Sequence, residues 1–247
     1  MLSIWRSWIA DIPSTLGPDS LGRAAPERPG SGQTGAVGRR RIIGIAGCPG
    51  AGKSTLAAGL VAEHPDTHVL VPMDGFHLAD EQLRRLGRAD RKGAPDTFDV
   101  DGYVALLERI ARADNAGNAD TTVYAPRFDR RIEASIANSI AIEPRHTTVI
   151  TEGNYLLHDA DGWERVRPLL DECWYVDCNY ATRIVRLIVR HLGHGRSATD
   201  AASWIRSVDE PNARLIRVKM TTADVIIRSE DGRLALPVPP DWRTPWW

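Results

Sequence analysis

A run of glycines followed by lysine and serine is the stretch of this sequence with the clearest chemistry. Residues 47–55 read Gly-Cys-Pro-Gly-Ala-Gly-Lys-Ser-Thr, which fits the pattern G-x-x-x-x-G-K-[ST]. Glycines let successive backbone N–H groups converge on phosphate oxygens at the start of a helix. The lysine of this pattern reaches the β- and γ-phosphates, and the serine hydroxyl ligates Mg²⁺. We therefore predict that a nucleotide's phosphates bind to Gly47, Gly50, Ala51, Gly52, Lys53, Ser54 and Thr55.

Acidic side chains that could act on a bound nucleotide follow the predicted strands. Asp74 lies just beyond a predicted strand at 68–71, and Glu152 ends another at 147–152. Ligands of open α/β sheets bind outside the carboxyl ends of the strands, so both carboxylates belong to the edge that holds the phosphate loop. A kinase needs a carboxylate there to accept the proton of the acceptor hydroxyl, and Asp74 suits this role. A plain Asp-Gly turn is the alternative interpretation of Asp74.

The phosphate loop alone does not distinguish kinases from GTPase switches, motors and transporter subunits. The sequence contains no N-K-x-D guanine motif, and residues 114–117 (Asp-Asn-Ala-Gly) are typical of a turn. Motors and transporters carry four apolar residues and then Asp at a strand end. Residues 173–177, which end in Asp177, come nearest to that pattern, so Asp177 competes with Glu152 for the magnesium role.

The elements that must position these residues alternate between strand and helix. Strands are predicted at 41–46, 68–71, 121–125, 147–152, 173–177 and 224–228, of which those at 41–46, 68–71 and 147–152 are expected to be buried. Helices are predicted at 56–63, 81–87, 103–112, 163–170, 181–192, 198–208 and 211–217, and a further one from Ile132, Ile136 and Ile140, which recur every four residues. This alternation predicts an α/β fold of the P-loop NTPase type, a doubly wound, mostly parallel sheet with helices on both faces.

Composition sets the class of protein and its compartment. The 247 residues have a net charge of −1, which gives no global field for binding nucleic acid or an anionic membrane. No apolar run approaches the roughly 18 residues that span a bilayer. Three cysteines without metal-ligand spacing favour the cytoplasm. We predict an N-terminal extension and linker at 1–38, whose first ten residues form a short amphipathic helix, one catalytic domain at 39–236, and a Pro/Trp-rich tail at 237–247.

Several motifs in order along the chain give a family resemblance. They are residues 73–77 (Met-Asp-Gly-Phe-His), 123–129 (Val-Tyr-Ala-Pro-Arg-Phe-Asp), 151–154 (Thr-Glu-Gly-Asn) and the arginine-bearing helix at 181–192. With the phosphate loop they resemble the uridine kinase, pantothenate kinase and phosphoribulokinase superfamily. Within it, residues 91–99, 150–157 and 208–213 resemble a bacterial nucleoside/nucleotide kinase-like branch, also labelled fructose-transport-system kinase. The resemblance covers about residues 40–228.

The resemblance implies a helical lid and a role for each matching residue. Asp74 matches the catalytic base, which acts with Lys53, and Glu152 matches the strand-end glutamate that supports Mg²⁺, in preference to Asp177. Acceptor binding would fall to Tyr124, Asp129 and the neighbouring His77, and Arg190 and Arg196 would be lid arginines over the ATP phosphates. Arg183 and Arg186 are expected to face solvent or pair with acids, and His191 and His194 to be structural parts of the lid.

The acceptor half departs from true uridine kinases. Their aromatic-Asp-His-Pro-Asp segment is replaced by residues 92–96 (Lys-Gly-Ala-Pro-Asp), and Asp129 stands in place of a histidine. These changes weaken the prediction of uridine as acceptor but leave phosphoryl transfer intact. Arg91 and Lys92 favour a phosphorylated or carboxylated acceptor, with a solvated loop as the equal alternative.

We conclude from the sequence that this is a Mg²⁺- and ATP-dependent kinase. It would phosphorylate a hydroxyl of a small metabolite such as a sugar, a nucleoside or a pantothenate-like alcohol. The alternative is a nucleotide-binding regulatory protein with slow ATPase activity, although a switch would not need Asp74 beside an acceptor-lining segment. The expected partners are ATP and the acceptor, without nucleic acid or a membrane span, and a homodimer is left open.

Overall fold

The computed structural model describes residues 40–112, 121–230 and 233–238, all within one compact unit, Gly38–Trp247. The strands of the main sheet are β1 (Arg41–Gly47), β2 (His68–Leu70), β5 (Thr148–Gly153), β6 (Glu172–Cys178), β7 (Val225–Glu230) and β8 (Arg233–Val238). A separate hairpin consists of β3 (Val123–Asp129) and β4 (Ala134–Ile142). The helices are α2 (Lys53–Glu63), α3 (Asp80–Arg85), α4 (Val100–Arg112), α5 (Tyr180–Gly193), α6 (Ala198–Trp204) and α7 (Glu210–Arg217).

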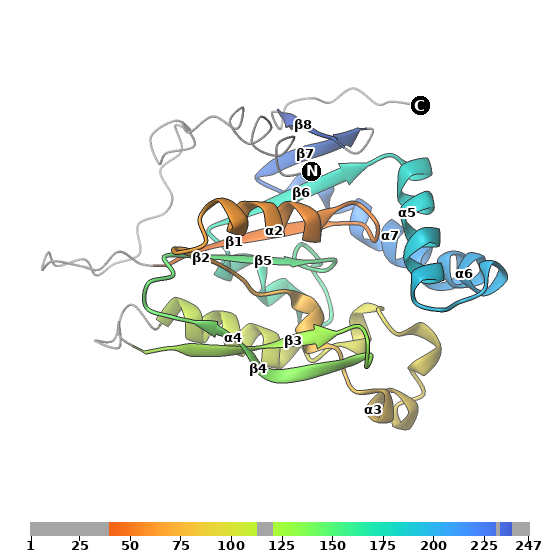
Figure 1. Cartoon of the computed structure of the whole chain (residues 1–247), viewed down its shortest axis with the longest axis horizontal. Coiled ribbons are helices and arrows are strands. Elements are labelled where there is room, and N and C mark those ends of the chain that lie inside the picture. Colours follow the sequence, from red (N-terminus) through yellow and green to blue (C-terminus); the bar gives the residue numbers. More distant parts are fainter. Residues whose placement is uncertain (1–39, 113–120, 231–232, 239–247) are drawn as a thin grey trace, which may run out of the picture. The chain divides into compact units, whose positions relative to one another are not determined.

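The main sheet has the order β2-β5-β1-β6-β7-β8, and Figure 1 shows β1 near its centre. The first five strands pair in parallel, so their carboxyl ends meet at one edge. Strand β8 then turns back and pairs antiparallel with β7. The predicted α/β fold with a mostly parallel sheet is confirmed. The last strand that the sequence predicts, at 224–228, corresponds to β7, and β8 extends the sheet beyond it.

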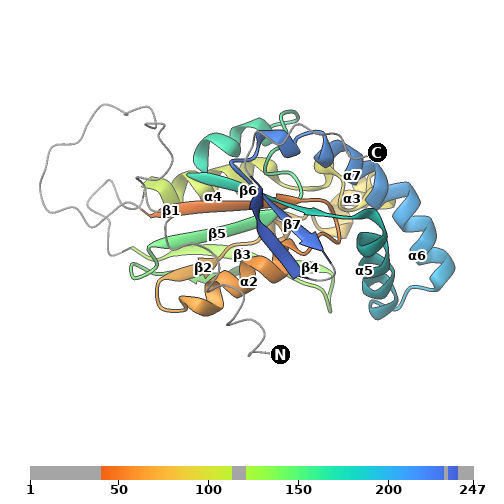
Figure 2. The same ribbon diagram turned by 90° about the horizontal axis from the view of Figure 1, so that it is seen from above.

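Alternation along β1 divides the core into two layers. Ile42 and Ala46 belong to the cluster that also contains residues of α4 and α7, whereas Ile43 and Ile45 belong to the cluster with residues of α2. Successive strand side chains point to opposite faces, so a strand with helices on both sides is apolar on both faces, as residues 42–47 of β1 are. Figure 2 shows α2 and α4 on opposite sides of the sheet.

The helix predicted from Ile132, Ile136 and Ile140 is wrong, because residues 134–142 form strand β4 paired with β3. A spacing of four residues is an even number, so it also places side chains on one face of a strand, and β-branched isoleucine favours the strand. The side chains do not form a core stripe either: Ile132 is 61% and Ile136 is 37% exposed. The buried end of the hairpin is Ile142, which is fully covered.

Other predicted elements differ mainly in their ends. The helix predicted at 163–170 consists of two short 3₁₀ turns, Trp163–Arg165 and Arg167–Leu169. The helices predicted at 198–208 and 211–217 are α6 and α7, joined by a π turn at Ile205–Asp209. Among the described helices none is long and apolar enough to cross a membrane. The division at residues 38 and 236 stays a prediction, and the helix predicted in the first ten residues lies outside the described part.

Candidate active site

A cavity of about 970 Å³ opens at the carboxyl edge of the sheet. Its walls come from the phosphate loop, from the segments after β2 and β5, from the hairpin turn and from the α5–α7 region. The structure brings together in its lining these predicted site residues: Lys53, Ser54, Asp74, His77, Glu152, Arg190 and Arg196. Ser54 and Glu152, which are 98 positions apart in the chain, meet here because parallel strands end at the same edge.

The glycines of the phosphate loop sit where no other residue fits well. Gly50 has a φ of 79°, and a Cβ on it would lie 2.9 Å from the backbone oxygen of Arg183 on α5. A Cβ on Gly47 would lie 2.7 Å from the backbone oxygen of Val176 on β6. Helix α2 begins directly after Gly52, with Lys53 as its first residue. The loop therefore packs tightly against its neighbours and presents a helix N-terminus, which attracts phosphate.

Lys53 points into the site from a buried position. Its side-chain nitrogen donates hydrogen bonds to Asn154 Oδ1 at 2.7 Å and to the backbone oxygen of Cys48 at 3.2 Å. Burial lowers the pKa of Lys53, and the nearby carboxylate of Glu152 opposes this shift. Asn154 follows β5 and also lines the cavity. The sequence contained this asparagine in the motif at 151–154, but no role was predicted for it.

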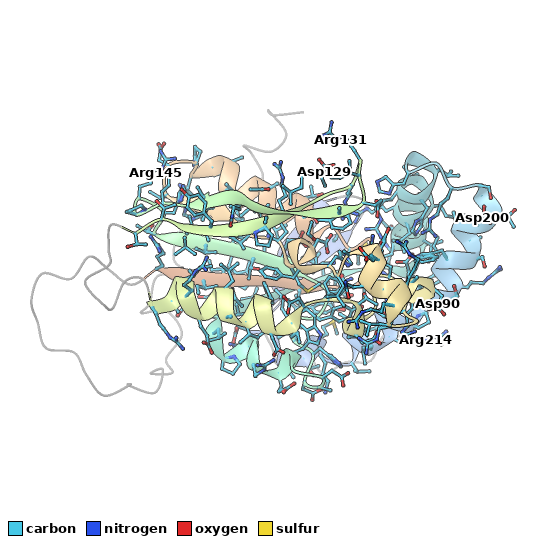
Figure 3. All side chains as sticks on the ribbon, turned by 90° about the horizontal axis from the view of Figure 1, so that it is seen from below. Asp90, Asp129, Arg131, Arg145, Asp200 and Arg214 are labelled. Carbon is cyan, nitrogen blue, oxygen red and sulfur yellow. The ribbon has the colours of Figure 1, made fainter. Side chains whose placement is uncertain are left out.

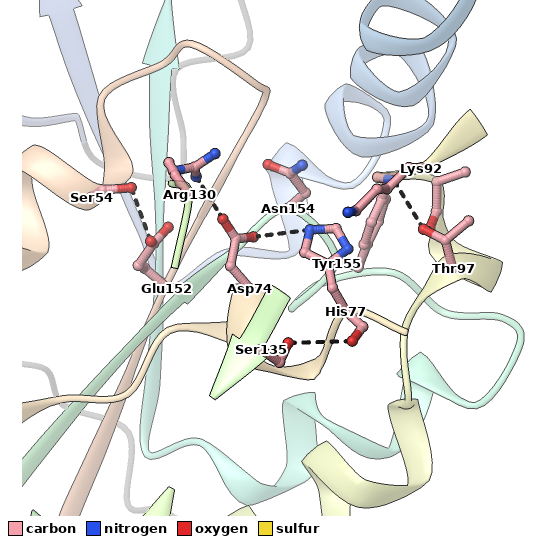
Figure 4. Close-up of polar contacts among 12 residues, drawn as sticks. Ser54, Asp74, His77, Lys92, Thr97, Arg130, Ser135, Glu152, Asn154 and Tyr155 are labelled. Carbon is pink, nitrogen blue, oxygen red and sulfur yellow. Dashed lines mark hydrogen bonds and ion pairs between the residues drawn. The ribbon is translucent and has the colours of Figure 1, made fainter. Parts of the chain in front are cut away.

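Ser54 and Glu152 form a pair of oxygen ligands. The Ser54 hydroxyl donates to Glu152 Oε1 at 2.9 Å (Figure 4). Burial, together with the negative charge of Asp74, raises the pKa of Glu152. Both effects would be relieved by a cation, and Mg²⁺ is held in kinases by one or two protein oxygens plus phosphates and water. Within the described residues no group of three or more His, Cys, Asp or Glu could hold a metal.

Asp177 does not line the cavity, although it also lies near a strand end. It occupies β6, where it pairs in register with Arg228 of β7. Glu152, by contrast, lies on β5 and contacts the phosphate-loop serine. This placement favours Glu152 over Asp177 as the magnesium-supporting carboxylate.

Asp74 lies in a 3₁₀ turn, Met73–Phe76, that follows β2. Its Oδ2 accepts a hydrogen bond from Arg130 Nη2 at 2.8 Å, and its Oδ1 lies 3.9 Å from His77 Nε2 (Figure 4). The next residue, Gly75, packs so closely that a Cβ would lie 2.5 Å from the backbone oxygen of Pro126. Asp74 and Gly75 therefore do form a tight turn, and this turn directs the Asp74 carboxylate into the cavity. The turn interpretation and the catalytic interpretation of Asp74 are compatible.

His77 is buried between aromatic rings. Its imidazole stacks on Phe98 with ring centroids 4.0 Å apart and lies against Phe128 at 4.9 Å. Burial lowers the pKa of His77 to about 4, so the ring is neutral at physiological pH. Its Nδ1 is buried without a hydrogen-bond partner in the structure.

The lid side of the cavity carries the two predicted arginines. Arg190 Nη2 lies 3.8 Å from Asp209 Oδ1, and His191 Nε2 lies 2.8 Å from the other oxygen of the same carboxylate. Arg196 stacks its guanidinium over the Trp204 ring at 3.9 Å. Burial lowers the pKa of Arg190. Asp209 thus links α5 to the π turn and holds Arg190 near the phosphate loop.

For Arg183 and Arg186 the sequence predicted either exposure to solvent or pairing with acids, and both side chains contact the phosphate loop. Arg183 is 1% exposed, donates to the backbone oxygen of Pro49 at 2.9 Å and pairs with Glu210, which confirms its pairing with an acid. Arg186 donates to the backbone oxygen of Ala51 at 3.1 Å. Both side chains therefore fasten α5 to the phosphate loop.

Two of the three predicted acceptor residues lie outside the cavity lining. Tyr124 is 50% exposed on β3, and Asp129 pairs with Arg131 at the tip of the hairpin (Figure 3). Their neighbours Phe128 and Arg130 line the cavity instead. Side chains alternate along a strand and the register was not known, so the sequence identified the segment but not which of its side chains face the cavity. Of the three, only His77 lies in the lining.

Comparison with known proteins places this architecture among kinases. The sequence model of the Phosphoribulokinase / Uridine kinase family matches residues 42–234. A candidate uridine kinase of Schizosaccharomyces pombe is 32% identical over 77% of this chain and 83% of its own length. A uridine kinase of Brevibacillus brevis is 31% identical over 77% and 86%. The crystal structure of a candidate fructose transport system kinase from Silicibacter sp. TM1040 superposes with a TM-score of 0.67 and 34% identity, covering 82% of this chain and 92% of that chain.

Proposed function

This chain belongs to the phosphoribulokinase and uridine kinase family of ATP-dependent small-molecule kinases, and on that premise we propose that it transfers the terminal phosphate of Mg²⁺-ATP to a hydroxyl group of a small metabolite. The acceptor classes are a sugar, a nucleoside or a pantothenate-like alcohol. The observation that carries the proposal is the meeting of Lys53, Ser54, Asp74 and Glu152 in one cavity.

The donor half would hold ATP by its phosphates. Backbone N–H groups of the phosphate loop and the Lys53 ammonium bind the β- and γ-phosphates, and Arg190 and Arg196 cover them from the lid. Ser54 and Glu152 would hold Mg²⁺, which neutralises charge on the phosphates when bound. The fixed positive groups stabilise charge in the transition state without having to reorganise.

The acceptor half would supply the base. Asp74 accepts the proton from the acceptor hydroxyl as its oxygen attacks the γ-phosphorus. The neutral His77 lies 3.9 Å from Asp74 and helps to shape the wall. All three cysteines (Cys48, Cys173 and Cys178) are free and buried, which supports a reducing compartment such as the cytoplasm.

A panel of alcohols tests this function. ADP release from Mg²⁺-ATP is followed with single sugars, nucleosides, pantothenate and their phosphorylated or carboxylated relatives, with a no-acceptor control. We expect release that depends on one class of compound and a product that carries the phosphate. Slow hydrolysis that no compound accelerates would favour the regulatory alternative instead.

A further inference from the structure

The resting site already contains a partner for the proposed base. Arg130, in the turn that joins β3 to β4, donates from Nη2 to Asp74 Oδ2 at 2.8 Å. The two side chains are 47% and 30% exposed, so this contact faces the cavity rather than the core. Figure 4 shows Asp74 between Arg130 on one side and His77 on the other.

The hydrogen bond from Arg130 obstructs the proposed role of Asp74 as the base. A guanidinium that is hydrogen-bonded to a carboxylate occupies oxygen lone pairs that a hydroxyl would otherwise use. The hydroxyl of the acceptor must also reach an oxygen of Asp74, and Arg130 occupies Oδ2. An anionic group bound beside Arg130 would accept its hydrogen bond instead and leave Oδ2 of Asp74 free.

The wall around Arg130 favours an anion over a neutral ligand. Lys92 from the loop after α3 also lies there, with its Nζ 2.7 Å from Asp80 Oδ1 and 3.7 Å from Glu133 Oε2. The lining also contains Arg84 and Arg131, and Arg131 pairs with Asp129, so Arg84, Lys92 and Arg130 are the cations that face the acids of this wall. A negative group on the acceptor would therefore find several cations within reach in this wall. Arginine in particular suits carboxylate and phosphate groups, which its planar fork can bind in bidentate fashion.

The aromatic rings of the same wall are engaged elsewhere. His77 stacks on Phe98, and Lys92 and Arg130 lie over Phe128 at 5.3 and 6.0 Å from the ring centroid. Nucleobases are commonly bound by stacking on an aromatic ring. The rings of this wall instead hold each other and the cations in place.

We propose that the acceptor is a small hydroxylated compound that carries an anionic group, a phosphate monoester or a carboxylate, and that this group takes Arg130 from Asp74. The base is then released only when the acceptor is bound. The acceptor hydroxyl gives its proton to Asp74, its oxygen bonds to the γ-phosphorus, and the bond from that phosphorus to the bridging oxygen breaks to leave ADP. This inference rests on the proposed function and narrows its substrate class.

Binding of small probes tests the inference apart from turnover. The full-length protein is saturated with Mg²⁺ and a non-hydrolysable ATP analogue, so that the phosphate loop is filled, and titrated calorimetrically with glycerol, glycerate and glycerol 3-phosphate. We expect at least one anionic probe to bind about tenfold or more tightly than glycerol, as a charge-assisted hydrogen bond provides. The glycerate and glycerol 3-phosphate arms distinguish a carboxylate from a phosphate ligand.

Arg130→Gln supplies the decisive variant, and Arg127→Gln is its matched control. Arg127 is an exposed arginine of the same hairpin and does not line the cavity. We expect Arg130→Gln to remove the preference for the anionic probe while the affinity for the ATP analogue stays within about threefold, and Arg127→Gln to change neither. Circular dichroism verifies that both variants are folded.

Several results would overturn the inference. One is that glycerol and both anionic probes bind with equal affinity, or that none of them binds. Another is that the preference for an anionic probe persists in Arg130→Gln. A third is that this variant loses affinity for the ATP analogue. Efficient phosphorylation of a neutral alcohol would support the proposed function and refute the anionic acceptor. If an anionic probe binds through Arg130 but no compound is phosphorylated, the anion site is supported and the proposed kinase function is refuted.

Discussion

At the scale of single residues, the site is built from charges that are held out of water. Lys53 and Glu152 are 8% and 7% exposed, and burial shifts the pKa of each toward its neutral form, downward for Lys53 and upward for Glu152. Phosphate beside the lysine and a cation beside the glutamate would favour the charged forms. We infer that the free protein carries an electrostatic cost at this site that its ligands relieve.

His77 gives a pH dependence with a definite sign. Its pKa in the folded protein is about 4, against an ordinary value of 6.5, because the ring is buried. As pH falls from 6.5 toward 4 the unfolded chain takes up a proton that the folded protein does not, so the folded state loses stability. We expect His77→Phe, which preserves the stacking on Phe98, to reduce this loss by about 3 kcal/mol. Urea unfolding at pH 7.5 and pH 4.5 measures it, and an unchanged difference between the two pH values would contradict the assignment.

The sequence predicts the residues that local patterns define and misses those that depend on tertiary contacts. Lys53 and Ser54 belong to one short motif, and Asp74 and Glu152 follow predicted strands, so all four could be found. Arg130 contacts Asp74 across 56 positions of sequence, and this contact depends on the register of the hairpin. No local pattern encodes that register, so Arg130 could not be distinguished from Arg127 or Arg131.

At the scale of elements, α5 acts as a brace for the phosphate loop. Arg183 and Arg186 donate to the backbone oxygens of Pro49 and Ala51, and Arg183 also reaches Glu210 at the start of α7. A shift of α5 or α7 would therefore change these hydrogen bonds and the position of the phosphate loop. This connection gives the lid region a physical link to the donor half of the site.

Removing the buried arginine tests the brace. We expect Arg183→Met to lower the free energy of unfolding by about 3 kcal/mol, because it leaves Glu210 and the Pro49 carbonyl without their partner, and to weaken ATP binding as well. The control is Arg145→Met, which breaks the exposed pair with Glu143 and should cost less than about 1 kcal/mol. Denaturant unfolding and calorimetry measure the two effects. Equal losses in both variants would show that Arg183 does not have this role.

A pair of isoleucines distinguishes the hairpin from the helix that periodicity suggested. In the hairpin Ile132 is 61% exposed, whereas Ile142 is completely buried. We expect Ile132→Ala to change the free energy of unfolding by less than about 0.5 kcal/mol and Ile142→Ala to lower it by about 2–5 kcal/mol. A helix with Ile132 in its core stripe would instead make Ile132→Ala costly, and denaturant unfolding decides between them.

Elements with a run of buried residues were the predictable ones. Strands β1, β5 and β6 are buried over almost their whole length, so their positions could be predicted closely. The segment at 132–142 is half exposed, and its isoleucine spacing fits both helix and strand. Its pairing with β3 depends on tertiary contacts, which the isoleucine spacing cannot predict.

At the scale of the whole molecule, the parallel order β2-β5-β1-β6 explains why distant residues act together. Strand β1 leads into the phosphate loop, β5 ends at Glu152 and Gly153, and β2 leads into the turn of Asp74. Parallel neighbours present their carboxyl ends on one edge, so donor and acceptor halves meet there. The alternation of strands and helices predicted this arrangement, whereas the antiparallel addition of β8 was not foreseen.

The central claim is that Asp74 serves as the base of a phosphoryl transfer. We expect Asp74→Asn to lower acceptor-dependent turnover by about 10²–10⁴, because one general base is lost, while ATP affinity stays nearly unchanged since the phosphate loop is intact. The matched control is Asp90→Asn, at a side chain that is 81% exposed, which should keep wild-type turnover.

The direct measurement is therefore acceptor-dependent release of ADP at saturating Mg²⁺-ATP by the wild type, Asp74→Asn and Asp90→Asn, with nucleotide affinity measured by calorimetry. A large loss of turnover confined to Asp74→Asn, with ATP binding retained, is the result that we expect. Wild-type turnover in Asp74→Asn would contradict the assignment of Asp74 as the base.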